Sequence, residues 1–269
     1  MNKRGFDHWV TTLLIVLGLM LGGCGRAKRE ITITLSGSTS VQPFAERLAE
    51  EYTLRNPEVR IDVQGGGSTA GIRAVKTGIC HLGMSSRELK EDEKDLNRIL
   101  IARDGLAIVI HPTNPLDDIS LDDVQRIFAG ELSNWKGLSG IDHPIYPITR
   151  EEGSGTREAF TGLIMKQSKI SPGTLVQDSS GAVREAIATN PYAIGYISLG
   201  LVNERVKALN IDGVTPTKEN IDSGAYPLTR PFLFVSMEEP KGKIKEFVDF
   251  VLSSDGQKIL EEEGLLSAR

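Results

Sequence analysis

The feature that most constrains the fold is the repeated alternation of short β-rich runs with amphipathic helices from residue 31 onward. In the first stretch, the predicted strands are residues 31–35, 59–64 and 81–84, and the predicted helices are residues 41–55, 69–77 and 91–97. Residues 106–111 are almost wholly apolar, which is typical of a strand buried on both faces. Alternation of this kind indicates an α/β fold with mixed, mostly parallel sheets.

Pro112, Asn114 and Pro115 interrupt this pattern, and a second α/β series follows them. Its predicted helices are residues 121–128, 156–166 and 182–190, and its predicted strands are residues 145–149 and 194–198. An apolar strand at 231–236 then precedes two C-terminal helices, at 243–252 and 255–263. We therefore expect two lobes, with the chain passing out and returning. Lobe 1 comprises residues 31–111 plus 232–269, lobe 2 comprises residues 114–225, and the two interlobe crossovers are residues 112–113 and 226–231.

Composition excludes several classes of function. The chain has 269 residues, 39% of them hydrophobic and 25% charged, which describes a globular protein. Its net charge of −5 argues against nucleic acid as a partner, and taken alone it also disfavours an anionic ligand. Two cysteines and four scattered histidines show no metal-ligand spacing, so we expect no metal and no cofactor. We expect a monomer.

The N-terminus has the features of a secretion signal rather than of a domain. Lys3 and Arg4 precede an apolar run that is shorter than the roughly 20 residues needed to span a bilayer. Residues 21–24, Leu-Gly-Gly-Cys, resemble a bacterial lipobox, which predicts a signal peptide at 1–23, lipidation of Cys24 and a tether at 24–30. The alternative is an ordinary signal peptide with an incidental cysteine. Cleavage would leave a mature chain with a net charge of −6. With Cys24 lipidated, Cys80 is the other cysteine of that chain, and we expect it to be a small core residue.

Four segments place glycine and small hydroxyl residues just before a predicted helix, at 36–40, 65–69, 152–156 and 178–181. Glycine allows close approach of a ligand, while the free amides of a helix start and adjacent hydroxyls donate hydrogen bonds to an anion. A single segment of this kind is usually only a helix cap. The first three carry glycine on both sides and together predict a convergent oxyanion pocket. We interpret 178–181 as an ordinary cap or pocket rim.

Two other kinds of site fit these segments poorly. No lysine follows the glycines in the spacing of a phosphate-binding P-loop. A secreted serine esterase or phosphatase would use Ser68 or Ser154, but neither lies in a complete G-x-S-x-G motif.

Arg150 precedes the third segment by two residues, at the end of a predicted strand. A guanidinium there can hydrogen-bond two oxygens of a tetrahedral anion, so we expect it to contact a ligand. The alternative is a surface salt bridge with Glu151 or Glu158.

The ordered motifs of the chain carry a resemblance. They are GSTS, QGGGSTAG, LGMSSRE, ARDGLAIVIHP, IFAGELSNW, TREEGSGTREAF, AIGYISL and YPLTRPFLFV. This succession resembles the phosphate-binding proteins of bacterial ABC phosphate importers, in their lipoprotein form, over nearly the whole mature chain. The resemblance implies the two-lobed type II periplasmic-binding-protein fold and inorganic phosphate held in an interlobe cleft. It also implies delivery to ABC importer permease subunits by a protein anchored through Cys24 on the outer face of the cell membrane or in the periplasm.

Carried over onto this sequence, the resemblance implies a set of ligand-binding residues. They are Ser38, Thr39, Ser40, Ser68, Arg150, Ser154, Gly155 and Thr156. Glu152 is implied as the acid that holds Arg150.

One position departs from the family pattern. Many members have an aspartate that accepts the proton of phosphate where this chain has Ser86, followed by Arg87. We expect Ser86 in the site, and Asp104 is the candidate replacement, with an ordinary turn aspartate as the alternative. Arg87 would either add positive charge or pair with Glu88. Without the acceptor, a receptor for sulfate or molybdate remains open, and so does a sensor that reports phosphate to a signalling partner.

Overall fold

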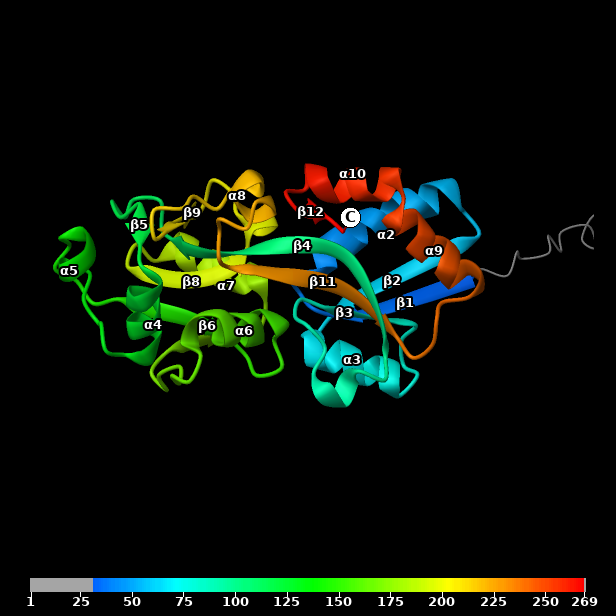
Figure 1. The fold of residues 1–269 in the computed structure, drawn as a ribbon, viewed down its shortest axis with the longest axis horizontal. Helices are drawn as coiled ribbons and strands as arrows, with labels where there is room; N and C mark the ends of the chain where they lie inside the picture. The colour runs from blue at the N-terminus through cyan, green and yellow to red at the C-terminus, as the bar shows by residue number, and fades with distance from the viewer. Residues whose placement is uncertain (1–30, 269) are drawn as a thin grey trace, which may run out of the picture.

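The computed structural model describes residues 31–268. The predicted signal peptide, Cys24 and the tether lie outside the described residues. No helix between residues 31 and 268 is long and apolar enough to cross a membrane. The described chain forms an elongated molecule with two halves joined by two long strands, as Figure 1 shows.

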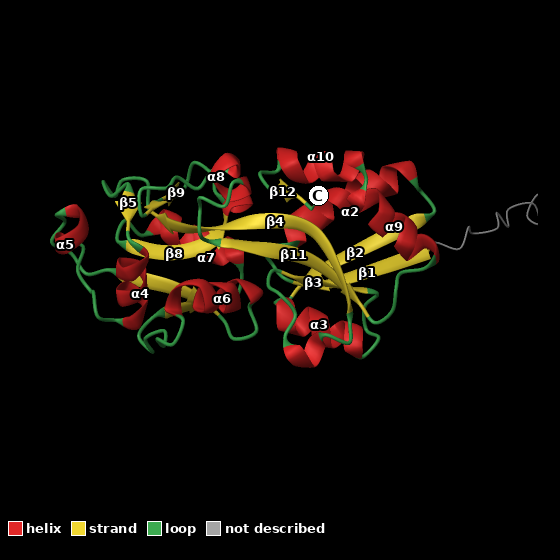
Figure 2. Cartoon of the chain, in the orientation of Figure 1, coloured by secondary structure: helices red, strands yellow, loops and turns green. Residues whose placement is uncertain are grey.

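The first half, on the right of Figure 1, is built from both ends of the described chain. Its strands are β1 (Ile31–Gly37), β2 (Val59–Gly65), β3 (Leu82–Ser85) and β12 (Leu266–Ser267). Its helices are α2 (Gln42–Arg55), α3 (Ser68–Lys76), α9 (Gly242–Leu252) and α10 (Ser254–Glu262). Helices α2, α9 and α10 cover one face of the sheet and α3 covers the other, so the central strand β3 is buried on both sides (Figure 2).

The second half is contiguous in the sequence. Its strands are β5 (Asp118–Ile119), β6 (Tyr146–Arg150), β7 (Leu175–Gln177), β8 (Ala193–Ser198), β9 (Lys207–Ala208) and β10 (Asn210–Ile211). Its helices are α4 (Leu121–Ala129), α5 (Lys136–Ser139), α6 (Gly155–Phe160), α7 (Ser180–Thr189) and α8 (Lys218–Asp222).

Strands β4 (Asn97–Ile110) and β11 (Thr229–Ser236) run through the middle of the molecule and join the halves. Within the described residues, the main sheet has the strand order β2-β1-β3-β11-β4-β8-β6-β7, with β12 and β9 also paired to β4. Pairs such as β1–β2 and β6–β8 are parallel, whereas β11 is antiparallel to both β3 and β4. This confirms the predicted mixed α/β fold.

The chain leaves the first half earlier than the sequence suggested. Ala102 packs in the core of the first half, whereas Leu106, Ile108 and Ile110 pack in that of the second half and pair with β8. The expected crossover at 112–113 therefore differs from the observed one, at Gly105 and Leu106 inside a continuous strand. The prolines end β4 rather than mark the crossing. The return passage, at residues 228–229, lies beside it, because Leu106 N–H donates to Leu228 C=O at 2.8 Å.

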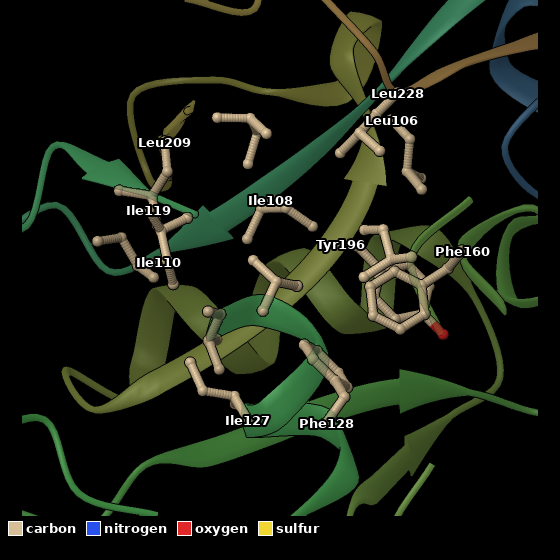
Figure 3. Close-up of a cluster of buried hydrophobic side chains, with 14 of the residues drawn as sticks. Leu106, Ile108, Ile110, Ile119, Ile127, Phe128, Phe160, Tyr196, Leu209 and Leu228 are labelled. Atoms are coloured by element: carbon tan, nitrogen blue, oxygen red, sulfur yellow. The ribbon is translucent and has the colours of Figure 1, made fainter. Parts of the chain in front are cut away.

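Figure 3 shows the core of the second half, where β4 and β8 contribute side chains to one cluster. The Phe160 and Tyr196 rings stack with centroids 3.9 Å apart, and α4 contributes Phe128 to the same group. Because burying one such side chain stabilises a fold by roughly 1.5–3 kcal/mol, this cluster fixes α6 against the sheet. Helix α6 begins at the candidate site, so its packing sets the position of that site.

Two predicted helices differ from the structure. Residues 91–97 form only one 3₁₀ turn at Glu91–Glu93, because the Glu93 carboxylate turns inward to Arg87 and Asn97 already begins β4. The helix predicted at 156–166 continues past α6 as a single π-helical turn, Thr161–Met165. Cys80 is buried, as predicted.

Candidate functional site

Buried hydroxyl groups from both halves meet where four helices begin. The hydroxyl residues and the one arginine of this group, which we call the hydroxyl cluster, each expose 2% or less of their surface. They are Ser38, Ser40, Ser68, Ser86, Arg150, Ser154, Thr156 and Ser180. Buried polar groups are costly unless they are hydrogen-bonded, so such a concentration of them indicates a site rather than a core.

The first half contributes three serines that sheet pairing brings together. Strands β1 and β3 are parallel neighbours, with Gly37 opposite Met84, so the residues that follow them lie side by side. Ser38 Oγ donates to Ser86 Oγ at 2.9 Å, and Ser86 N–H donates to Ser68 Oγ at 3.1 Å. Gly37 has φ 142°, and a side chain there would lie 2.9 Å from the backbone nitrogen of Met84, so only glycine allows this approach.

Other contacts of the cluster join the two halves. Ser40 Oγ lies 2.7 Å from Thr156 Oγ1 and 2.7 Å from Ser180 Oγ, so one hydroxyl of the first half contacts two of the second. A Cβ atom on Gly155 would lie 2.8 Å from Ser86 Oγ and closer still to Ser68 Oγ. The halves are therefore in direct contact at the site, and Gly155 is required for that contact.

Two helices of the first half begin beside the cluster. Helix α2 begins after Val41 and α3 begins after Gly67, and neither has a side-chain cap. The amides of a helix's first turn have no partner within the helix, and the helix dipole gives this end a partial positive charge. These ends therefore suit a negatively charged oxygen without needing a full positive charge.

Arg150, at the end of β6, points into the cluster. Its Nη1 donates to Ser180 Oγ at 3.1 Å, and its Nη2 donates to Thr39 Oγ1 at 3.1 Å, across the boundary between the halves. Its Nε and Nη2 also lie 2.9 Å from the two carboxylate oxygens of Glu151. The guanidinium thus pairs with Glu151, but as a buried group and not in the surface salt bridge of the alternative interpretation, and it also faces the hydroxyls.

Comparisons with known proteins agree with this geometry. Residues 25–255 match the family model described as the PBP superfamily domain. The phosphate-binding protein PstS of Bacillus subtilis is 36% identical over 248 residues, which are 90% of this chain and 82% of the relative. A phosphate ABC transporter substrate-binding protein with bound phosphate from Clostridium perfringens is 39% identical, with a TM-score of 0.86, over 88% of this chain and 100% of the other. A phosphate transport receptor from Vibrio cholerae is 38% identical, with a TM-score of 0.73, over 87% of this chain and 99% of the other. This chain belongs to the PBP superfamily and, within it, to the PstS family.

In this PstS-family chain the acid that holds the arginine is Glu151 and not Glu152, which was the residue expected. The backbone N–H of Glu151 still donates to Gln177 C=O at 3.1 Å, so strand pairing continues one residue beyond β6 and keeps Glu151 beside Arg150. Glu152 follows at the turn before Gly153 and is exposed.

Asp104 is buried, but it lies at the crossing between the halves of the PstS-family fold rather than in the cluster. Its Oδ1 accepts a hydrogen bond from Ser198 Oγ at 2.7 Å, and its Oδ2 accepts one from Arg230 Nε at 2.9 Å. Burial raises the pKa of Asp104, against the opposing effect of Arg230, and burial likewise lowers the pKa of Arg230. Among the described residues, the partners of Asp104 are thus groups at the crossing, and the structure does not bring Asp104 to the serines of the hydroxyl cluster.

The contacts of the Arg87 side chain also differ from both expectations. It contacts the backbone of Glu88 and not its side chain, since Nη1 donates to Glu88 C=O at 2.8 Å while the Glu88 carboxylate pairs with Arg98. Its guanidinium instead pairs with Glu93 and with Glu158 of the second half. Arg87 therefore lies next to the hydroxyl cluster along the chain without contributing a free charge to it.

The sequence predicts an ordinary cap or pocket rim at 178–181, whereas the structure places Ser180 within the hydroxyl cluster, beside Ser40 and Arg150. Its segment, 178–181, has the same glycine and hydroxyl composition as the other three, and that composition was the available signal. The histidines of residues 31–268 lie elsewhere: His81 contacts Thr34, His111 contacts Thr113, and His143 stacks on Tyr192. Ser68 and Ser154 are therefore not paired with an imidazole in the described chain.

Proposed function

We propose that this protein captures inorganic phosphate at the hydroxyl cluster between its two halves and delivers it to an ABC-type phosphate importer. The observation that carries the proposal is the convergence of Ser40, Thr156 and Ser180 from opposite halves around Arg150. The relatives from Bacillus subtilis and Clostridium perfringens, named for phosphate binding, support the same conclusion.

The cluster offers the chemistry that a tetrahedral anion needs. The hydroxyls are those of the cluster together with the neighbouring Thr39, namely Ser38, Thr39, Ser40, Ser68, Ser86, Ser154, Thr156 and Ser180. Arg150 supplies a fork of N–H donors, and Gly155 permits close approach of the backbone. Each hydroxyl can rotate its proton from a neighbouring hydroxyl to a ligand oxygen, so binding exchanges hydrogen bonds instead of creating unpaired groups. Groups from both halves are needed at once, so the ligand favours the closed arrangement.

The acidic composition is compatible with this role. Glu151 offsets the charge of Arg150, and Arg230 offsets that of Asp104. Capture then depends on short hydrogen bonds and helix-start amides rather than on net charge. We expect weak long-range attraction of the anion and affinity that comes mainly from the closed site.

The cellular setting is part of the same proposal. Lipidation of Cys24 would hold a monomer outside the cytoplasm, at the outer face of the cell membrane or in the periplasm, next to the importer's permease subunits. Metabolic labelling with a palmitate analogue tests the anchor, because a Cys24→Ala variant should lose the label.

A second candidate ligand is another tetrahedral oxyanion such as sulfate or molybdate. The observation that favours it is that the carboxylates of Glu151 and Asp104 are both already paired with arginines, Glu151 with Arg150 and Asp104 with Arg230. A carboxylate accepts a hydrogen bond from protonated phosphate and repels sulfate, so a site without a free carboxylate discriminates less between them. Serine hydrolysis has no comparable support, because the histidines within residues 31–268 contact other groups and not Ser68 or Ser154.

The experiment is a ligand panel on protein that has been unfolded, dialysed and refolded to remove bound anions. Thermal unfolding is followed with phosphate, sulfate, molybdate and a set of amino acids. A ligand at 100 times its dissociation constant should stabilise the protein by about 2.7 kcal/mol. No shift with phosphate, together with a clear shift for another compound, would refute the proposal.

A further inference from the structure

Glu158 of α6 lies in the second half, and its carboxylate faces three side chains of the first half. Its Oε2 lies 3.0 Å from Arg87 Nε and 2.8 Å from Lys90 Nζ. Its Oε1 accepts a hydrogen bond from Thr69 Oγ1 at 3.2 Å. Because each of these contacts joins the two halves, all three are lost when the halves separate.

Arg87, one of the two cationic partners of Glu158, is held in place by other residues of the first half. Arg87 Nη1 and Nη2 lie 2.7 and 2.9 Å from the two carboxylate oxygens of Glu93, and Nη1 also donates to the carbonyl of Glu88. Burial alone would lower the pKa of Arg87, but Glu93 and Glu158 raise it above its ordinary value. When Glu158 moves away, the guanidinium keeps Glu93 as its partner, so opening leaves no buried charge unpaired.

Both partners are directly connected to the hydroxyl cluster. Arg87 follows Ser86 in the chain, and the backbone N–H of Glu158 donates to Ser154 C=O at 3.0 Å in the first turn of α6. Any movement that brings Ser86 towards Gly155 therefore also brings Arg87 towards Glu158. The carboxylate itself contacts Arg87, Lys90 and Thr69 and lies outside the cluster.

We propose that Glu158 is a positioning residue that stabilises the closed arrangement and slows release of the ligand without touching it. This inference rests on the proposed function for its choice of phosphate as ligand. The contacts of Glu158 form only after the halves close, so they affect the dissociation rate rather than the association rate. Since they join opposite charges and Glu158 is 26% exposed, salt weakens them.

The test uses Glu158→Gln, which keeps the size of the side chain and an oxygen for Thr69 but removes the charge. In stopped-flow measurements with inorganic phosphate, its dissociation rate constant should be about three- to tenfold higher than that of the wild type. Its association rate constant should change by less than about twofold. The matched control is Glu185→Gln, because the pair of Glu185 with Arg205 lies within the second half and its loss should leave both rates unchanged.

Salt dependence separates this role from a purely structural one. Raising NaCl from about 0.05 M to about 0.5 M should speed release from the wild type and the control but not from Glu158→Gln. Lys90→Gln should change the dissociation rate in the same direction by a smaller factor. Equal dissociation rates for wild type and Glu158→Gln would overturn the inference. If the wild type binds another oxyanion and not phosphate, the proposed function fails, and the same comparison with that oxyanion decides the inference.

Discussion

Replacement of Gly155 by alanine is the sharpest test of how the halves meet. The added Cβ would lie 2.9 Å from Ser68 Cβ and 2.8 Å from Ser86 Oγ. Carbon atoms pack best at about 3.5–4.0 Å, so the two halves must separate by at least about 0.6 Å. Ser68 cannot turn aside without cost, because its Oγ accepts the hydrogen bond from Ser86 N–H.

The expected loss is in binding and not in folding. Overpacking of a fitted contact costs about 1–3 kcal/mol, which corresponds to a phosphate dissociation constant about 5- to 150-fold higher. The clash involves two halves that can move apart, so unfolding of the ligand-free protein by urea should change by less than about 0.5 kcal/mol. Titration calorimetry on ligand-stripped protein measures the first quantity, and a urea transition measures the second.

Gly162→Ala is the matched control, since a Cβ there would meet no atom within 4 Å. It should bind phosphate like the wild type. If Gly155→Ala also binds phosphate with wild-type affinity, the reasoning is refuted. That result would mean that Gly155 does not contact Ser68 and Ser86 in the phosphate-bound form. Lower stability of the ligand-free protein would also count against it.

Three further predictions concern charged groups. Arg150→Lys removes the guanidinium fork that contacts Ser180 and Thr39, so the phosphate dissociation constant measured by calorimetry should rise about 10- to 150-fold. The control is Arg205→Lys, which changes a surface ion pair and should leave the dissociation constant unchanged. Asp104→Asn leaves Arg230 buried without its counter-charge, so unfolding by urea should become easier by about 3–5 kcal/mol while the ratio of phosphate to sulfate affinity stays constant. A changed ratio would instead place Asp104 at the ligand. Burial alone would raise the pKa of Glu93, but hydrogen bonds from Arg87 and the Lys90 backbone hold it below its ordinary 4.5. That stabilisation is present at neutral pH and is lost as the pH falls through the lowered pKa, so between about pH 5 and about pH 3 the free energy of unfolding should fall more steeply in the wild type than in Glu93→Gln.

Local signals predicted that three segments of the chain lie together. Glycine and hydroxyl residues before a helix act within a few residues of the chain, and three of the predicted segments, around Ser40, Ser68 and Thr156, do meet in the structure. The prediction missed Ser180 because one such segment by itself has the same composition whether it caps a helix or faces a ligand. Only the position of β6 and Arg150 next to it distinguishes the two cases.

The remaining differences come from contacts between distant parts of the chain. Asp104 and Arg230 are 126 residues apart, and nothing near Asp104 in the sequence indicates which cation it meets. Whether Glu151 or Glu152 pairs with Arg150 depends on one further residue of strand pairing, between Glu151 and Gln177. The sequence pattern did not indicate the position of the crossing at Gly105, because a strand that continues from one core into another has the same apolar pattern as one that stays in a single core.

The course of β11 also has a consequence for the order in which the protein is completed. This strand lies between β3 and β4 in the sheet, so the centre of the first half comes from residues 229–236, which follow the whole of the second half in the sequence. Residues 106–228 are contiguous and can assemble as they emerge, whereas the first half exposes the unpaired edges of β3 and β4 until β11 arrives. The binding site therefore forms only after β11 has been made, and deletion of β11 and the residues after it should remove the site even though every residue of the hydroxyl cluster is still present.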